Sequence, residues 1–263
     1  MEGGVTTPSF VGIGPVTSST SPPWPGAGLT ITSGKEPSGI TVGDRVFLFC
    51  AFQSPYGSPF FDHFNCSNAG WAATSPAFGR HSYGSGSYVG VYAWTARWTP
   101  SLLPTTVAPK QWDGSAMGDR SGSNDRYRCY LAAWTPSQSS TGGTSSTASG
   151  GSYLPRTSPA YGTGTFTADG LAVMVGHASM AVYSSGTLNG FTARVNRRDA
   201  PSWSTDPDLI IADKPFVGGD GGYGPYFDTT LGISGGVLLL RLDSPDPPIR
   251  RPRTSVGILV ARA

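Results

Sequence analysis

Residues 42–52, VGDRVFLFCAF, place a Gly-containing turn directly before an uninterrupted run of apolar side chains. The same arrangement returns at residues 169–175, DGLAVMV, and at residues 235–242, GGVLLLRL. Apolar runs this short, bounded by turn signals, are typical of buried strands rather than of helices. Because the three runs lie far apart in the chain, they predict one β-rich core assembled from distant segments.

Further strands are predicted where aromatic and β-branched residues concentrate between Gly, Pro and Ser. They lie at residues 29–33, 88–98, 128–135, 163–168, 171–183, 191–195, 209–212 and 225–233. Residues 55–83 are expected to form a long aromatic loop and residues 112–126 a polar loop. Apolar spacing of 3.6 residues is nowhere sustained, so no amphipathic helix is expected. The predicted fold class is an all-β antiparallel sandwich with long loops rich in Gly, Pro and aromatic residues.

The 263 residues are consistent with one main domain and two appendages. Residues 1–27 are expected to be an extended arm that packs through side chains rather than a folded element, and residues 28–243 the β-sandwich. Within the sandwich, residues 137–152 have the Ser/Thr/Gly composition of a flexible loop that cannot bury a core face. Residues 244–263 combine a Pro- and Arg-rich connector with an apolar strand-like end, which is expected to dock on this domain or on a neighbouring subunit. The candidate docking residues in the two appendages are Trp24, Arg250, Arg251, Arg253, Ile258 and Val260.

Charged residues make up only 13% of the chain, and the net charge is +2. A nucleic-acid-binding protein needs a basic face, so this balance argues against nucleic acid as a partner. Only Lys35, Lys110 and Lys214 among the 18 basic residues are Lys, a skew that a GC-rich coding sequence explains more simply than selection of Arg for bidentate contacts. The first residues lack the basic and apolar regions of a signal peptide, and no apolar run is long enough to span a membrane. We therefore expect neither a secretion signal nor membrane insertion.

The sequence contains no recognisable catalytic or metal-binding motif. His63, His81 and His177 do not have metal-ligand spacing, and no G-x-S-x-G stands between a strand and a helix. Asp206 and Asp208 could form a carboxylate pair of the kind that glycosidases use, although a chance pair in a loop is the simpler interpretation. We expect no enzyme activity, no cofactor and no metal.

The three cysteines, Cys50, Cys66 and Cys129, are widely spaced and form no C-x-x-C motif. Cys50 and Cys129 lie inside apolar strand-like runs, where a free cysteine behaves as a small hydrophobic residue. The spacing leaves open whether two of the three form a disulfide.

Aromatic residues in loop-like stretches are the better candidates for binding. Sugars stack their apolar faces on exposed aromatic rings beside hydrogen-bonding side chains, and aromatic side chains also anchor protein interfaces. The alternative is that such residues fill the open ends of the sandwich. The candidate glycan- or partner-binding residues are Trp71, Trp112, Asp113, Trp203, Tyr223 and Tyr226.

The order of these elements resembles minor tail proteins of long-tailed phages that infect actinobacteria. The resemblance covers about residues 28–243 and consists of the kinds of strands and turns and their order rather than of a catalytic motif. Its elements are Val42-Gly43-Asp44 with the strand 46–52, Gly70-Trp71, residues 88–95, residues 131–136, Asp169-Gly170 with the strand that follows, and residues 236–242.

The resemblance implies a jelly-roll-like β-sandwich without enzyme activity, located in the virion tail and made in the host cytoplasm. Its implied partners are other phage structural proteins, copies of itself in a symmetric oligomer such as a trimer, and host-surface polysaccharide. Two alternatives remain open from the residues alone: a tail enzyme that degrades polysaccharide, and a decoration or fibre protein on the capsid.

Overall fold

Among the residues that the computed structural model of this chain describes, fifteen strands carry almost all of the regular structure. The structure describes residues 7–18, 29–54, 61–83, 87–112, 117–119, 126–135, 142–147, 170–179, 191–197, 209–216 and 234–243. Within these ranges the only helical element is the 3-10 turn Pro100–Leu102, so no helix there is long and apolar enough to cross a membrane. The strands are β1 (Ser9–Ile13), β2 (Thr17–Ser18), β3 (Leu29–Ile31), β4 (Arg45–Ser54), β5 (Phe61–Cys66), β6 (Ala72–Tyr83), β7 (Ser87–Arg97), β8 (Thr105–Trp112), β9 (Met117–Asp119), β10 (Arg126–Thr135), β11 (Gly142–Thr147), β12 (Gly170–Ser179), β13 (Thr192–Arg197), β14 (Leu209–Phe216) and β15 (Ser234–Asp243).

The strands form three sheets in which every described pairing is antiparallel. The central sheet has the order β1-β10-β4-β7-β6, with β2 also paired to β10. The small sheet has the order β3-β8-β5, with β9 paired to β8. The C-terminal sheet has the order β11-β15-β12-β14-β13. The expected all-β antiparallel sandwich is therefore confirmed.

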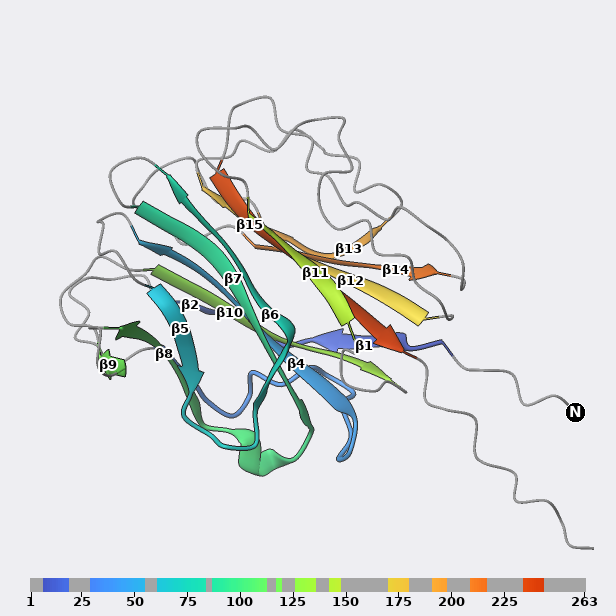
Figure 1. Cartoon of the computed structure of the whole chain (residues 1–263). Helices are drawn as coiled ribbons and strands as arrows, with labels where there is room; N and C mark the ends of the chain where they lie inside the picture. The colour runs from blue at the N-terminus through green and yellow to red at the C-terminus, as the bar shows by residue number, and fades with distance from the viewer. Residues whose placement is uncertain are drawn as a thin grey trace, which may run out of the picture.

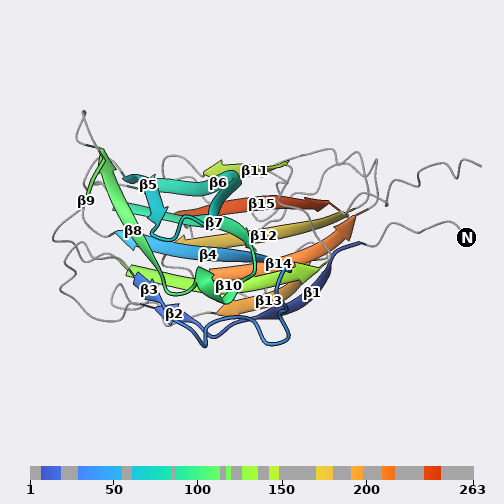
Figure 2. The same cartoon turned by 90° about the horizontal axis from the view of Figure 1, so that it is seen from below.

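The central sheet is covered on both faces, which gives the molecule three layers rather than the two of a simple sandwich. In β4, Val46, Leu48 and Cys50 point into a first core shared with the small sheet, whereas Phe47 and Phe49 point into a second core shared with the C-terminal sheet. Figure 1 shows β5 and β8 on one side of the central strands and β12 to β15 on the other, and Figure 2 shows the same layers from below.

This double burial explains the sequence of β4. Successive side chains of a strand point to opposite faces, so a strand with one solvated face alternates between apolar and polar residues. A strand that is buried on both faces has no polar position and reads as a continuous apolar run. β10 follows the same rule, since Cys129 and Leu131 belong to the first core and Tyr130 and Ala132 to the second.

Two predicted loops contain strands instead. The expected aromatic loop 55–83 includes β5 and β6, and the expected polar loop 112–126 includes β9. β6 is an edge strand whose register against β7 shifts between Ala73 and Phe78, around Pro76. Pro lacks a backbone N–H and is tolerated at edges and bulges, which is why this segment does not look like a strand in sequence.

The segment 137–152 was also expected to be a flexible loop, but residues 142–147 form β11 at the edge of the C-terminal sheet. Its residues, GGTSST, pair with β15 from Gly142 opposite Arg241 to Thr147 opposite Gly236. An edge strand needs only backbone hydrogen bonds along one side, so a sequence without apolar side chains can supply it.

The N-terminal arm was expected to be an appendage, and its described part is integrated in the central sheet instead. β1 pairs with β10 from Ser9 opposite Thr135 to Ile13 opposite Ala132, and β2 pairs with the same strand. At Gly14, directly after β1, the backbone passes so close to the backbone of Lys35 that a Cβ atom would clash with the Lys35 carbonyl oxygen. Only a residue without a side chain fits at that point.

The other strand predictions agree in place. The strand expected at 29–33 is β3, those at 88–98 and 128–135 are β7 and β10, and those at 191–195 and 209–212 are β13 and β14. The strand expected at 171–183 is described as β12 up to Ser179. Residues 163–168, 225–233 and 244–263 lie outside the described residues.

Candidate functional site

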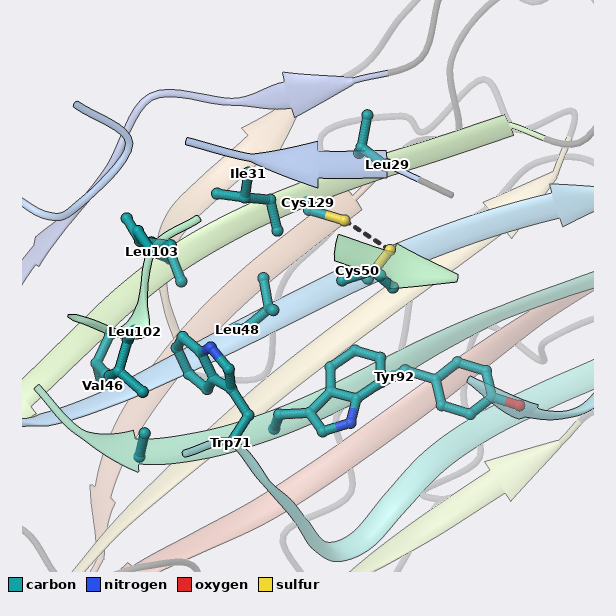
Figure 3. Packing of buried hydrophobic residues seen from close by; sticks show 14 of the residues in the cluster. Leu29, Ile31, Val46, Leu48, Cys50, Trp71, Tyr92, Leu102, Leu103 and Cys129 are labelled. Atoms are coloured by element: carbon teal, nitrogen blue, oxygen red, sulfur yellow. Dashed lines mark hydrogen bonds between the residues drawn. The ribbon is translucent and has the colours of Figure 1, made fainter. Parts of the chain in front are cut away.

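Trp71 is the one predicted binding residue whose side chain the structure describes. It is 7% exposed and belongs to the first core, where Figure 3 shows it beside Leu48 and Leu102. Its indole Nε1 is buried and has no hydrogen-bond partner among the described residues. This position agrees with the alternative interpretation, that an aromatic residue fills the end of the sandwich, and Trp71 offers no ring face to a sugar at the surface.

Trp112 lies at the end of the β8–β9 hairpin. The pairing of β8 with β9 puts Trp112 opposite Met117, so Trp112 is the last paired residue before the connection 113–116. Both Figure 1 and Figure 2 place this hairpin at one end of the described molecule, away from the C-terminal sheet. The side chain of Trp112 is not among those that the structure describes, so its binding role stays a prediction.

The remaining predicted site residues lie outside the described residues. They are Asp113, Trp203, Tyr223 and Tyr226 among the binding candidates, and Trp24, Arg250, Arg251, Arg253, Ile258 and Val260 among the docking candidates. Asp206 and Asp208, considered as a carboxylate pair, also lie outside them.

The most developed polar cluster in the described structure joins two sheets. Asp213, on β14, accepts a hydrogen bond at Oδ2 from Nε1 of Trp134, on β10, over 2.8 Å. The guanidinium of Arg194, on β13, donates to both carboxylate oxygens of Asp213, through Nε at 2.8 Å and a terminal nitrogen at 2.9 Å. The side chain of Asp213 is only 3% exposed and that of Arg194 is 29% exposed. The geometry is the bidentate arrangement in which Arg and a carboxylate bind most strongly.

The same cluster holds the N-terminal strand. The guanidinium carbon of Arg194 lies 4.4 Å from the centre of the Phe10 ring, on β1, which is a cation–π contact. Phe10 also packs against Trp134, with ring centres 5.7 Å apart. Trp134 in turn contacts Phe47 edge to face at 5.7 Å. One cluster thus connects β1, β10, β13 and β14.

A second polar cluster fixes the turn that precedes β4. The carboxylate of Asp44 accepts hydrogen bonds from the backbone N–H of Thr41 at 2.9 Å, from the Thr41 hydroxyl at 3.0 Å and from the Thr135 hydroxyl at 3.0 Å. Partial burial opposes ionisation of Asp44, but these hydrogen bonds and the charge of Arg97 outweigh it, and the pKa of Asp44 lies below its usual value. This cluster explains the Val-Gly-Asp turn: Gly43 has a φ of +95°, which favours Gly, and Asp44 closes the turn.

All three cysteines lie in or beside the first core. Cys50 and Cys129 are buried and face one another from β4 and β10, and Cys66 packs at the border of the same core from β5. Figure 3 shows Cys50 and Cys129 joined by a hydrogen bond. Sequence reasoning placed Cys50 and Cys129 in strands but could not bring the three cysteines together, because strand order is not visible in a single sequence.

The carboxylates of both polar clusters are engaged within the fold: the Asp213 cluster joins two sheets, and the Asp44 cluster holds the turn before β4 to the end of β10. The oxygens of Asp213 are occupied by Arg194 and Trp134, and those of Asp44 by Thr41 and Thr135. Within the described ranges, no group of three or more His, Cys, Asp or Glu side chains is placed to hold a metal ion.

Sequence reasoning missed Asp213, Arg194 and Phe10 as a unit. The available signal was Asp213 itself, a carboxylate directly after the apolar run Leu209–Ala212, because a buried charge requires a partner. Comparison with protein family models, with curated proteins and with solved structures finds no match for this chain.

Proposed function

We propose that this chain is a structural component of a phage virion, a minor tail or tail-tip protein that contributes to tail assembly and to adsorption on host-surface glycans. In this role it assembles as a symmetric homo-oligomer beside other phage structural proteins, and it catalyses no reaction. The resemblance of residues 28–243 to minor tail proteins is the starting point of this proposal.

The observation that carries the proposal is the use of buried charge in the fold. Burying a carboxylate is costly unless it is paired and hydrogen-bonded. Asp213 is buried, and its charge is paired with Arg194 and hydrogen-bonded to Trp134 in a cluster that joins two sheets and the N-terminal strand. A layered all-β fold whose N-terminal strand is held by this cluster is suited to a structural role within an assembly.

Adsorption is assigned to loops at the end of the molecule where the β8–β9 hairpin lies. Trp112 is the last paired residue of that hairpin. An aromatic residue beside polar groups such as Asp113 has the chemistry that sugar binding needs. Trp71 is buried and is not part of this surface.

The assembly part of the proposal is tested on the purified chain and on isolated tails. Light scattering should give a mass that is a multiple of 27.4 kDa, and the chain should co-sediment with tails. The same preparation should release no sugar from host cell-wall polysaccharide. A strictly monomeric chain that does not associate with tails, or release of sugar that disappears in Asp206→Asn, contradicts the proposal.

The adsorption part is tested with Trp112→Ala, which should weaken binding to host cell envelopes at least tenfold without changing the melting temperature. Met117→Ala, at the position opposite Trp112 in the same hairpin, is the matched control and should bind as the wild type does. Equal binding by both variants argues against glycan recognition by this hairpin while leaving the assembly role intact.

A further inference from the structure

Cys50 and Cys129 occupy directly opposite positions on neighbouring antiparallel strands. The register of β10 against β4 pairs Cys129 with Cys50. Residues opposite each other in an antiparallel pair have Cα atoms about 4.5–5.5 Å apart. Disulfides span Cα separations of about 4.4–6.8 Å, so residues paired in this way lie within the range that a disulfide can bridge.

The two sulfur atoms already point at each other. The thiol of Cys129 donates to Sγ of Cys50, and the sulfur atoms are 2.6 Å apart. Figure 3 shows the two side chains turned toward each other between β4 and β10.

Cys66 is the competing thiol, and its position disfavours it as a partner. It lies on β5 in the small sheet, where its register partner is Val107, and it is half-buried. A disulfide from Cys66 has to cross between layers, whereas Cys50 and Cys129 are neighbours within one sheet.

We propose that Cys50 and Cys129 are the pair that closes to a disulfide when the chain folds under oxidising conditions, and that Cys66 stays a free thiol. The bond would link β4 to β10 in the middle of the central sheet. This inference does not depend on the proposed function.

The oxidant in this proposal is a low-molecular-weight disulfide such as oxidised glutathione. One protein thiolate attacks a sulfur of the small disulfide, which forms a mixed disulfide and releases one small thiol. The second protein thiolate then attacks the protein sulfur of the mixed disulfide and releases the second small thiol. Two protein thiols are oxidised, one small disulfide is reduced, and the two protons end on the two released thiols.

The bond should form while the sheets assemble rather than afterwards. Both thiols are inaccessible in the folded chain, and burial raises the pKa of the Cys129 thiol well above its usual value, which suppresses the reactive thiolate. A chain that folded while reduced should accordingly react slowly with the same oxidant.

The test is a cysteine map of the full chain. The chain is refolded with oxidised glutathione, then unfolded in guanidinium chloride with iodoacetamide, digested without reduction and analysed by mass spectrometry. The expected map has Cys66 alkylated and the peptides that contain Cys50 and Cys129 linked, with the link lost on reduction. The Cys66→Ala variant should give the same link, and Cys129→Ala should leave Cys50 alkylated or bound to glutathione.

Three results overturn the proposal: alkylation of Cys50 and Cys129 in the oxidised wild type, glutathione retained on either of them, or a bond that includes Cys66. The wild-type map decides the question even if a cysteine variant fails to fold.

Discussion

The indole Nε1 of Trp134 donates a hydrogen bond to Oδ2 of Asp213 over 2.8 Å, although the two residues are 79 positions apart in the chain and lie in different sheets. Trp134 belongs to the central sheet and Asp213 to the C-terminal sheet. Most contacts between these sheets are apolar and therefore non-directional. The hydrogen bond from Trp134 to Asp213 is directional, so it fixes the position of the C-terminal sheet relative to the central sheet.

A double-mutant cycle on this pair should give a coupling of about 1–3 kcal/mol, because a buried hydrogen bond to a charged group is among the stronger kinds. The variants are Trp134→Phe, Asp213→Asn and the combination, compared by equilibrium unfolding in urea. Asp213→Ala should be worse than Asp213→Asn, since it leaves both Arg194 and the indole N–H without their acceptor. Purely additive effects of the two single changes contradict the finding that the bond couples the sheets.

Removing the Phe10 side chain should release the N-terminal strand. Phe10→Ala removes the contact with Trp134 and the cation–π contact with Arg194, and the expected loss is about 1–3 kcal/mol of unfolding free energy. Phe10→Leu keeps apolar volume but not the ring, so it is the matched control and should lose less. Proteolysis of the native chain should cut before residue 18 faster in Phe10→Ala. If the truncated chain lacking residues 1–13 is as stable as the full chain, β1 is not part of the folded unit.

Two adjacent residues of β4 should be equally intolerant of truncation. Leu48 belongs to the first core and Phe49 to the second, and both are fully buried. Leu48→Ala should cost about 2–5 kcal/mol and Phe49→Ala about 3–5 kcal/mol, measured by chemical denaturation. Val42→Ala, at a side chain that is 71% exposed, should change stability by less than about 0.5 kcal/mol. A large cost at only one of the two buried positions indicates a two-layer sandwich.

Strands that carry a long apolar run can be predicted from this sequence, whereas strands without such a run are missed, among them β8 in the middle of the small sheet. β4, β10 and β15 are visible as apolar runs because burial removes polar positions from them. β6 and β11 are not, since Pro76 interrupts the first and the residues GGTSST of the second contain no large side chain. Both are edge strands, and the backbone hydrogen bonds that hold them can be made by any residue except Pro.

The candidate site was less accessible to sequence reasoning. Trp71 follows a Gly in a segment that resembles a loop, and nothing in its neighbours indicates that Leu102 and Leu103 cover it. The cluster of Asp213, Arg194, Trp134 and Phe10 draws on residues between positions 10 and 213, so only the sheet order reveals it. The sheet order is also what brings the three cysteines close together, so the sequence alone does not show it.

Stability should fall in acid partly through Asp44. Its pKa is depressed in the folded chain, so the ionised form contributes stability that is present above the usual value of 3.8 and is lost as the pH falls through the folded pKa. Unfolding free energy measured between pH 6 and about pH 2 should therefore decline less steeply below about pH 4 in Asp44→Asn than in the wild type. Other carboxylates titrate in both proteins, so the difference between the two curves isolates Asp44. Parallel curves contradict the assignment.

Locating the chain in the intact particle tests the proposed function most directly. Antibodies raised against the purified chain are bound to virions of the phage proposed to encode it, and the labelled particles are imaged by electron microscopy. The account predicts label at the tail or tail tip, at a symmetric set of positions. Label on the capsid, or particles without label whose protein content lacks this chain, would contradict it.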